Sequence, residues 1–186
     1  MIAGLTVLLL SALAPPSGDA ARCRLTAADK QANARLSFND FDQQGTLPSS
    51  ARKLGEAGCW EQAAEATADY LIHGPVPSPG EQRVLLFHLG QELAFAGEEE
   101  RAAGFIAATR RPPDPMPPKT DQLNWNDYVI GTWAFLMKDR PALIAARDAV
   151  LATAGEGNRI NGALLAAMER CFDKPYEVAY DPDCGR

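Results

Sequence analysis

Apolar side chains recur every three to four residues along most of the chain, which is the period of an α-helix. Over about 60–72 they form one stripe, made of Trp60, Ala63, Ala64, Thr67, Ala68 and Leu71. A second stripe precedes Gly97 and contains Leu86, Leu89, Leu93 and Ala96. The pattern predicts helices through the body of the chain, and no segment favours a strand.

Glycine and proline residues separate the expected helices. Their ranges are about 27–38, 48–58, 60–72, 79–96, 98–110, 123–137, 140–154 and 159–172, with loops at 39–47 and 111–119. Thr26, Asp139 and Asn158 are expected to cap helices, and Ser78 with Glu81 forms a capping box. The order predicts hairpins over about 48–72, 79–110 and 123–154, followed by an extra helix over 159–172.

Composition agrees with one helical domain. The 186 residues are 46% hydrophobic and 23% charged, which is typical of a single folded domain rather than a disordered chain. There are 32 Ala residues against 12 Val and Ile together, and this balance favours helix over strand. The formal net charge of −6 argues against a nucleic-acid partner, which requires a basic face.

The first twenty residues have the pattern of a secretory signal peptide. Residues 2–14 are an apolar run that is too short to span a bilayer, which takes about 20 residues. Small-x-small sites end at Ala14 and Ala20, and we favour cleavage after Ala20 because Pro15 and Pro16 follow the first site. We expect a mature chain of residues 21–186, without a stable membrane span, in the periplasm or outside the cell.

Four cysteines follow the expected cleavage site, at Cys23, Cys59, Cys171 and Cys184. An even number in an exported chain indicates disulfides, and four cysteines allow three pairings. We favour Cys23 with Cys59 and Cys171 with Cys184, because each pair ties a terminal segment to the nearest helix. The cysteines lack the close spacing of a zinc site.

A short pattern repeats within the predicted hairpins. Residues 57–64 and 96–103 both read Ala-Gly-x-x-Glu-x-Ala-Ala, at an offset of 39, and a fainter third copy follows at an offset of 40. Gly58 and Gly97 are expected to end the first helix of a hairpin in a left-handed conformation. The small residues at the end of each copy let two helices lie close together.

The pattern resembles tetratricopeptide repeats. Leu89-Gly90, Leu93, Gly97, Ala102 and Ile106 fall close to that family's spacing, and Leu54-Gly55 and Ile130-Gly131 echo it. The repeat of 39–40 residues is longer than the family's usual length of about 34, and the aromatic positions are incomplete. The resemblance implies an all-α fold of stacked antiparallel helical hairpins, a fragment of an α-solenoid, that presents a concave surface to a protein or peptide partner.

The sequence contains no strong catalytic, cofactor or metal-binding motif. A Gly-x-Ser-x-Gly elbow, a Gly-rich phosphate loop and a dinucleotide fingerprint are all missing. Asp40 and Asp42 with Gly45 match the start of a calcium loop, but Ala51 stands where the bidentate Glu is required. We therefore expect no cofactor, no metal and no assigned catalytic residue.

The best candidates for partner binding are Trp125, Tyr128 and His88. Exposed aromatic rings serve binding well, but a core position also explains Trp125 and Tyr128 and is the interpretation that we favour. His88 lies among Leu85, Phe87 and Leu89, which indicates a partly buried core or groove position.

These observations favour a non-enzymatic binding or scaffold protein. The chain also resembles helical-repeat proteins that many bacteria export, most of them without an assigned activity, and this resemblance implies a place in the bacterial envelope. The alternative is an enzyme, or an enzyme accessory, acting on envelope polymers. In that case His88 and Glu92 would be an acid–base pair, because residues four apart share one face of a helix. A carrier of a small ligand in a cavity between hairpins is a third possibility.

Overall fold

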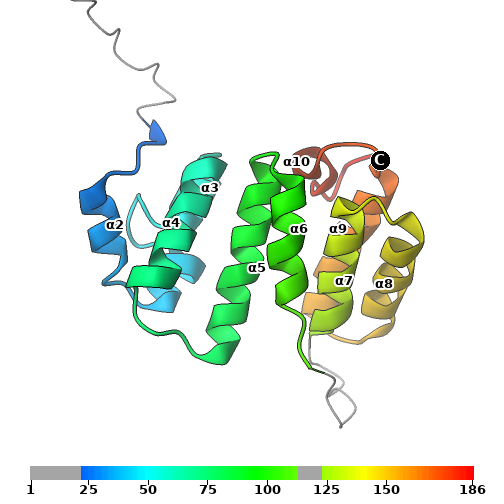
Figure 1. Ribbon diagram of the computed structural model, residues 1–186. Coiled ribbons are helices and arrows are strands. Elements are labelled where there is room, and N and C mark those ends of the chain that lie inside the picture. Colours follow the sequence, from blue (N-terminus) through cyan, green and yellow to red (C-terminus); the bar gives the residue numbers. More distant parts are fainter. Residues whose placement is uncertain (1–21, 113–122) are drawn as a thin grey trace, which may run out of the picture.

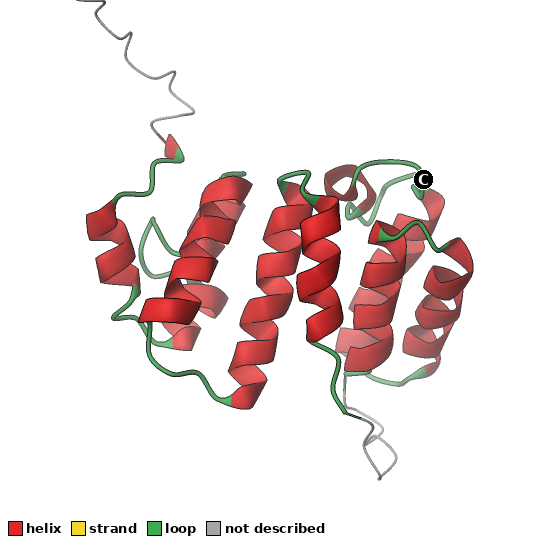
Figure 2. Cartoon of the chain, in the orientation of Figure 1, coloured by secondary structure: helices red, strands yellow, loops and turns green. Residues whose placement is uncertain are grey.

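A computed structural model describes residues 22–112 and 123–186, which form a row of helices standing side by side (Figure 1). Figure 2 shows helices and connecting loops, with no strand in the described part of the chain. The all-α prediction is therefore confirmed. The expected signal peptide and the proline-rich part of the loop at 111–119 lie outside the described residues.

The long helices follow each other in chain order along the row. The bounds of the helices are α2 Ala27–Asn33, η1 Asn39–Gln44, α3 Ala51–Glu56, α4 Trp60–His73, α5 Pro79–Phe95, α6 Glu99–Ala108, α7 Trp125–Leu136, α8 Arg140–Ala152, α9 Glu156–Arg170 and α10 Tyr176–Ala179. The short α10 folds back onto α5 and α9. None of the helices in the described ranges is both long and apolar enough to cross a bilayer.

Neighbouring helices pack pairwise into hairpins. The pairs α3–α4, α5–α6 and α7–α8 occupy the ranges where hairpins were expected, and α9 packs on both α7 and α8 at the end of the row. Each element contacts mainly its neighbours in sequence, which gives the solenoid-like order that the sequence predicted.

The turn between the two helices is the same in each of these hairpins. Gly58 and Gly97 adopt positive φ angles of 74° and 83°, and Lys138 takes the same place in the third turn with φ 57°. In each turn the next N–H donates to the carbonyl five residues back: Cys59 to Leu54, Glu98 to Leu93 and Asp139 to Ala134, each at 2.8 Å. The third copy is faint in the sequence because a lysine occupies the position that favours glycine.

Small residues let the helices approach each other closely. A Cβ placed on Gly90 would lie 2.8 Å from the Ile106 side chain, and one on Gly131 would lie 2.7 Å from Leu165. Ala102 and Ala103 of α6 are buried. These contacts give the Leu-Gly and Ala-Ala positions of the repeat a packing role.

The region before the first hairpin differs from the expectation in two ways. Thr26 caps the first helix with Asp29 as expected, but the helix ends at Asn33 and not near 38. The predicted loop at 39–47 contains a π-helical turn, η1, held by stacking of Phe41 on Tyr70 at a ring distance of 4.0 Å. This long-range contact is invisible to local sequence patterns.

Asn158 is not the cap of the last long helix, so that prediction was wrong. The helix begins at Glu156 with Gly155 before it, and Asn158 lies buried within its first turn. Its Oδ1 accepts a hydrogen bond from the Asn124 N–H, and its Nδ2 donates to the Ala154 carbonyl. Asn158 therefore joins α9 to the start of α7.

Candidate functional site

A groove opens on the face formed by the first helices of the hairpins, between α3 and α5. We call it the α3–α5 groove. Its volume is about 260 Å³. Its polar lining consists of Asp42 from η1, Arg52 and Glu56 from α3, and His88, Gln91 and Glu92 from α5. These residues come from segments up to fifty positions apart, so the stacking of the first two hairpins creates the groove.

Asp42 and His88 form the closest polar contact in the groove. The His88 Nδ1 lies 2.7 Å from the Asp42 Oδ1, and the two side chains are 28% and 2% exposed. Phe41, which is fully buried, anchors η1 and so fixes the position of Asp42. The carboxylate orients the imidazole ring, which lines the groove.

Glu92 lies one helical turn after His88 and is only 7% exposed. No described residue makes a hydrogen bond to its Oε2. Burial raises the pKa of the Glu92 carboxyl to about 8. The negative charge on Asp42 raises this pKa further. The nearby Thr67 hydroxyl, although it lies outside hydrogen-bond geometry, and the positive charge of Arg52 both lower it. The Glu92 side chain is therefore mostly protonated at neutral pH.

Aromatic rings form the apolar wall of the groove. Trp60 of α4 stacks on Phe95 of α5, with ring centroids 4.2 Å apart and planes at 15°. Gly55 of α3 makes room for the indole, because a Cβ there would lie 2.8 Å from the Trp60 ring. Tyr180, which follows α10, completes this side of the groove.

The C-terminal segment covers the neighbouring part of the same face. It contains α10, which packs on α5 and α9. Gln91 donates its Nε2 hydrogens to the hydroxyls of Tyr176 and Tyr180, at 3.0 and 3.1 Å, and Tyr180 meets Tyr128 of α7 at 3.3 Å. Burial raises the pKa of Tyr176 and of Tyr128 well above the usual tyrosine value, so both hydroxyls stay protonated.

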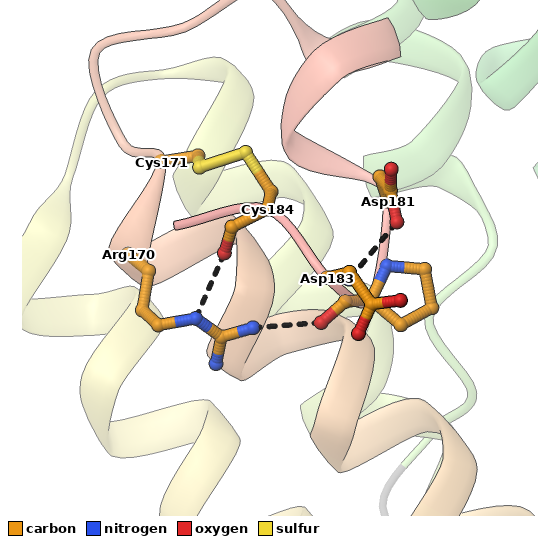
Figure 3. Close-up of a disulfide and its surroundings, with 6 residues drawn as sticks. Arg170, Cys171, Asp181, Asp183 and Cys184 are labelled. Atoms are coloured by element: carbon orange, nitrogen blue, oxygen red, sulfur yellow. Dashed lines mark hydrogen bonds between the residues drawn. A yellow bond between two sulfur atoms is a disulfide. The ribbon is translucent and has the colours of Figure 1, made fainter. Parts of the chain in front are cut away.

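A disulfide between Cys171 and Cys184 holds the C-terminal segment in place (Figure 3). Beside it, Arg170 points back at the chain end and donates to the carbonyls of Cys184 and Pro182, at 2.9 and 2.8 Å. The second disulfide joins Cys23 to Cys59. The structure therefore adopts the pairing that the sequence analysis favoured, and the C-terminal bridge fixes Tyr180 as a wall of the groove.

Of the three candidates for partner binding, only His88 lies in the groove. Trp125 is 8% exposed and donates its Nε1 hydrogen to the Thr109 carbonyl at 2.8 Å. Tyr128 is 4% exposed and is covered by the C-terminal segment. Both residues belong to the core, which is the role that the sequence analysis favoured over partner binding.

Several residues of the groove were not identified from the sequence as a site. Asp42 was considered only as part of a calcium-loop pattern, and Trp60 only as part of a helix stripe. The spacing of His88 and Glu92 was the one local signal, and both residues do line the groove. Within the described residues, no group of three or more His, Cys, Asp or Glu side chains is arranged to hold a metal ion.

Comparison of the chain with family models, with curated proteins and with solved structures finds no match. The interpretation of the α3–α5 groove therefore depends on its own chemistry. That chemistry combines a buried carboxylate paired with a histidine, a protonated glutamate and an aromatic wall. Such a site can hold a polar or charged side chain against an apolar surface, or it can exchange protons with a bound molecule.

Proposed function

We propose that this protein is a binding module of the bacterial envelope that captures a protein partner through the α3–α5 groove. The partner inserts one side chain into the groove as an anchor. In this proposal the helical hairpins act as a tetratricopeptide-like scaffold, and the groove is the part of their shared face that the C-terminal segment leaves open.

The observation that carries the proposal is the Glu92 carboxyl. It is buried, it lines the groove, and no described residue satisfies its Oε2. A buried polar atom without a hydrogen-bond partner costs about 1–3 kcal/mol of stability. A ligand in the groove that forms a hydrogen bond or ion pair with this atom would remove that cost. The volume of about 260 Å³ is slightly below the range of drug-sized pockets and suits a single side chain.

The two disulfides support a place in the periplasm or outside the cell. Disulfides persist in oxidising compartments and are rare in the cytosol. The described residues contain both bridges and no free cysteine. Together with the apolar run at the N-terminus, they support export as part of the proposal.

The test uses fluorotryptophan NMR, because the chain has three tryptophans and only Trp60 lines the groove. Random heptapeptides displayed on phage are selected on the oxidised protein, and the recovered peptides are titrated into fluorotryptophan-labelled protein. We expect the Trp60 resonance to shift, while Trp125 and Trp133 serve as internal controls. Recovery of no peptide, or of peptides that leave Trp60 unchanged, would overturn the proposal.

A second candidate function is acid–base catalysis on an envelope polymer. The specific observation in its favour is the Asp42–His88 contact at 2.7 Å beside the protonated Glu92. A carboxyl that burial keeps protonated can act as a general acid, and a histidine beside it can act as a general base. Here His88 would accept a proton from the attacking water, and Glu92 would donate a proton to the leaving group.

Release of soluble fragments from purified peptidoglycan tests this second function. Activity must fall by about 10²-fold or more in a His88→Asn variant, because general acid–base catalysis contributes about that much. His73→Asn is the matched control, since His73 lies at the exposed end of α4. Equal activity in both variants would show that the groove does not catalyse this reaction.

A further inference from the structure

We infer that the α3–α5 groove selects a basic side chain, a lysine or arginine of the partner, whose charge is held between the carboxyls of Asp42 and Glu92. This inference rests on the proposed function and specifies the chemistry of the anchor. It follows from the charges that line the groove, the position of its one arginine and the aromatic wall.

Carboxyl groups outnumber guanidinium and ammonium groups in the lining of the groove. Asp42, Glu56 and Glu92 face a single guanidinium, that of Arg52. Asp42 and Glu92 lie at the buried end, whereas Glu56 and Arg52 are exposed. An anionic ligand that reached the buried end would be repelled by Asp42, whereas a cationic ligand would be attracted by Asp42 and would favour ionisation of Glu92.

The Arg52 guanidinium offsets only part of the negative charge at this end of the groove, where it acts against the raised pKa of Glu92. Its Nε donates to the backbone carbonyl of Asp42 at 3.0 Å, and it makes no ion pair with a carboxylate among the described residues. The Asp42 side chain is shared between His88 and Gln43. The Glu92 Oε2 has no such partner in the described chain, so its carboxyl is the group that a ligand cation would satisfy.

The walls suit the long stem of a basic side chain. Lysine and arginine bury their methylene groups along apolar surfaces and keep the charged end at a polar site. Trp60, Phe95 and Tyr180 provide that surface along one side of the groove. The faces of aromatic rings also attract cations, which adds about 0.5–2 kcal/mol in known cases.

Uptake of a cation should release a proton from Glu92. A positive charge within about 4–6 Å lowers a carboxyl pKa by about 1–3 units. Because the Glu92 pKa is about 8 without a ligand, binding at pH 7 converts a mostly protonated carboxyl into one that is half to almost fully ionised. At pH 9 the carboxyl is already ionised, so the release should nearly vanish.

The other ionisable groups around Glu92 are few. Those that face it or line the same groove are Asp42 from η1, Arg52 and Glu56 from α3, His88 from α5 itself, and Tyr180 from the C-terminal segment. From α4 the neighbours are Thr67 and Trp60, which do not titrate in this range. A variant at Glu92 therefore separates its proton from those of the other groups.

The experiment compares three capped amino acids of similar length: N-acetyl-lysine methylamide, N-acetyl-norleucine methylamide and N-acetyl-glutamate methylamide. Each is titrated at pH 7 while the fluorotryptophan resonance of Trp60 is followed. We expect the lysine derivative to bind at least tenfold more tightly than the other two. Calorimetry in buffers of different ionisation enthalpy should then show release of about half to one proton at pH 7.

Glu92→Gln is the decisive variant, because it keeps the shape of a protonated carboxyl and cannot release a proton. We expect it to bind the lysine derivative at least tenfold more weakly and to abolish the proton release. Glu61→Gln, at an exposed position in the first turn of α4, is the matched control and should behave as the wild type.

The outcomes separate the two proposals. If selected peptides shift Trp60 but the norleucine or glutamate derivative binds as well as the lysine derivative, the basic anchor is wrong and the binding function stands. Proton uptake in place of release would also overturn the basic anchor. If neither peptides nor any derivative shifts Trp60, the binding function itself fails.

Discussion

The face formed by α3, α5, α7 and α9 has two regions that differ in how they are filled. Over α5, α7 and α9 the chain covers the face with its own C-terminal segment, and Tyr176 is fully buried there. Over α3 and α5 the face stays open as the α3–α5 groove. Gln91 and Tyr180 lie at the boundary between the two regions, because both line the groove. They are hydrogen-bonded to each other, and the Tyr180 hydroxyl also contacts the Tyr128 hydroxyl in the covered region.

The polar groups of the two regions are satisfied to different degrees. In the covered region the Tyr176, Tyr180 and Tyr128 hydroxyls share hydrogen bonds with each other and with Gln91. In the open region Glu92 keeps an oxygen that no described residue satisfies. Complete satisfaction indicates a structural role, whereas an unsatisfied buried group beside an opening is typical of a functional site.

The largest expected effect concerns the covered region. Tyr176→Ala should lower the free energy of unfolding by about 4 kcal/mol, because it removes a fully buried ring from between Phe95 and Phe135. Val178→Ala is the control, since Val178 is 46% exposed in the same helix and should cost less than about 0.5 kcal/mol. Urea denaturation measures both, and equal losses would show that the segment does not dock.

Removal of the C-terminal disulfide should have the next largest effect. Cys171→Ser with Cys184→Ser opens a loop with a sequence separation of 13 and should cost about 3 kcal/mol of stability. Hydrogen exchange should rise in residues 176–184 and not in α3 or α4. In the control, Cys23→Ser with Cys59→Ser, protection of the C-terminal segment should persist; loss of it there would break the distinction between the two regions.

A smaller effect is expected from His88 in the open region. His88→Ala should cost about 2 kcal/mol, because it leaves the buried Asp42 Oδ1 without its partner. His73→Ala, at an exposed helix end, should change stability by less than about 0.5 kcal/mol. Thermal unfolding at constant pH compares the two variants, and equal effects would show that the Asp42–His88 contact contributes nothing.

The pH dependence that Glu92 imposes is the smallest effect when it is counted per pH unit. Its carboxyl has a pKa of about 8 in the folded chain and 4.5 as the reference value, so the folded state binds more protons between these limits. Stability should therefore fall as the pH rises through this window, by at most about 1.4 kcal/mol for each pH unit. The fall should stop above pH 8.

Glu92→Gln should remove this slope, and chemical denaturation at pH 5, 6, 7 and 8 measures it. Asp29 and Glu81 do not interfere, because capping hydrogen bonds lower the pKa of both and their protons are lost below the window. A slope that is identical in Glu92→Gln and in the wild type would show that Glu92 is ionised in the fold. The Glu92 carboxyl would then no longer be a difference between the open groove and the covered region.

The sequence predicted the helices well where local rules decide them. The capping box at Ser78 and Glu81 and the cap at Asp139 are present, because each depends on residues three apart. The turns at Gly58 and Gly97 follow from the left-handed conformation that glycine accepts. Local rules gave wrong predictions at 39–47 and at Asn158. Stacking of Phe41 on Tyr70 decides the structure of the first segment, and a hydrogen bond with Asn124 decides the place of Asn158.

The site was only partly predictable for the same reason. His88 and Glu92 are four residues apart in one helix, so their shared face can be derived from the helical period. Asp42 is 46 positions from His88, and Gln91 is 85 positions from Tyr176. Such contacts exist only after the hairpins have stacked and the C-terminal segment has folded back.

By itself the sequence determined an all-α chain of repeated hairpins with paired cysteines, because helical period, turn glycines and capping residues act over a few positions. The tertiary structure alone decided which part of the shared face is closed and which is open. It placed Trp125 and Tyr128 in the core and brought Asp42 to His88. The reason is physical: packing of distant segments sets burial, and burial sets the protonation and hydrogen bonding of groups such as Glu92.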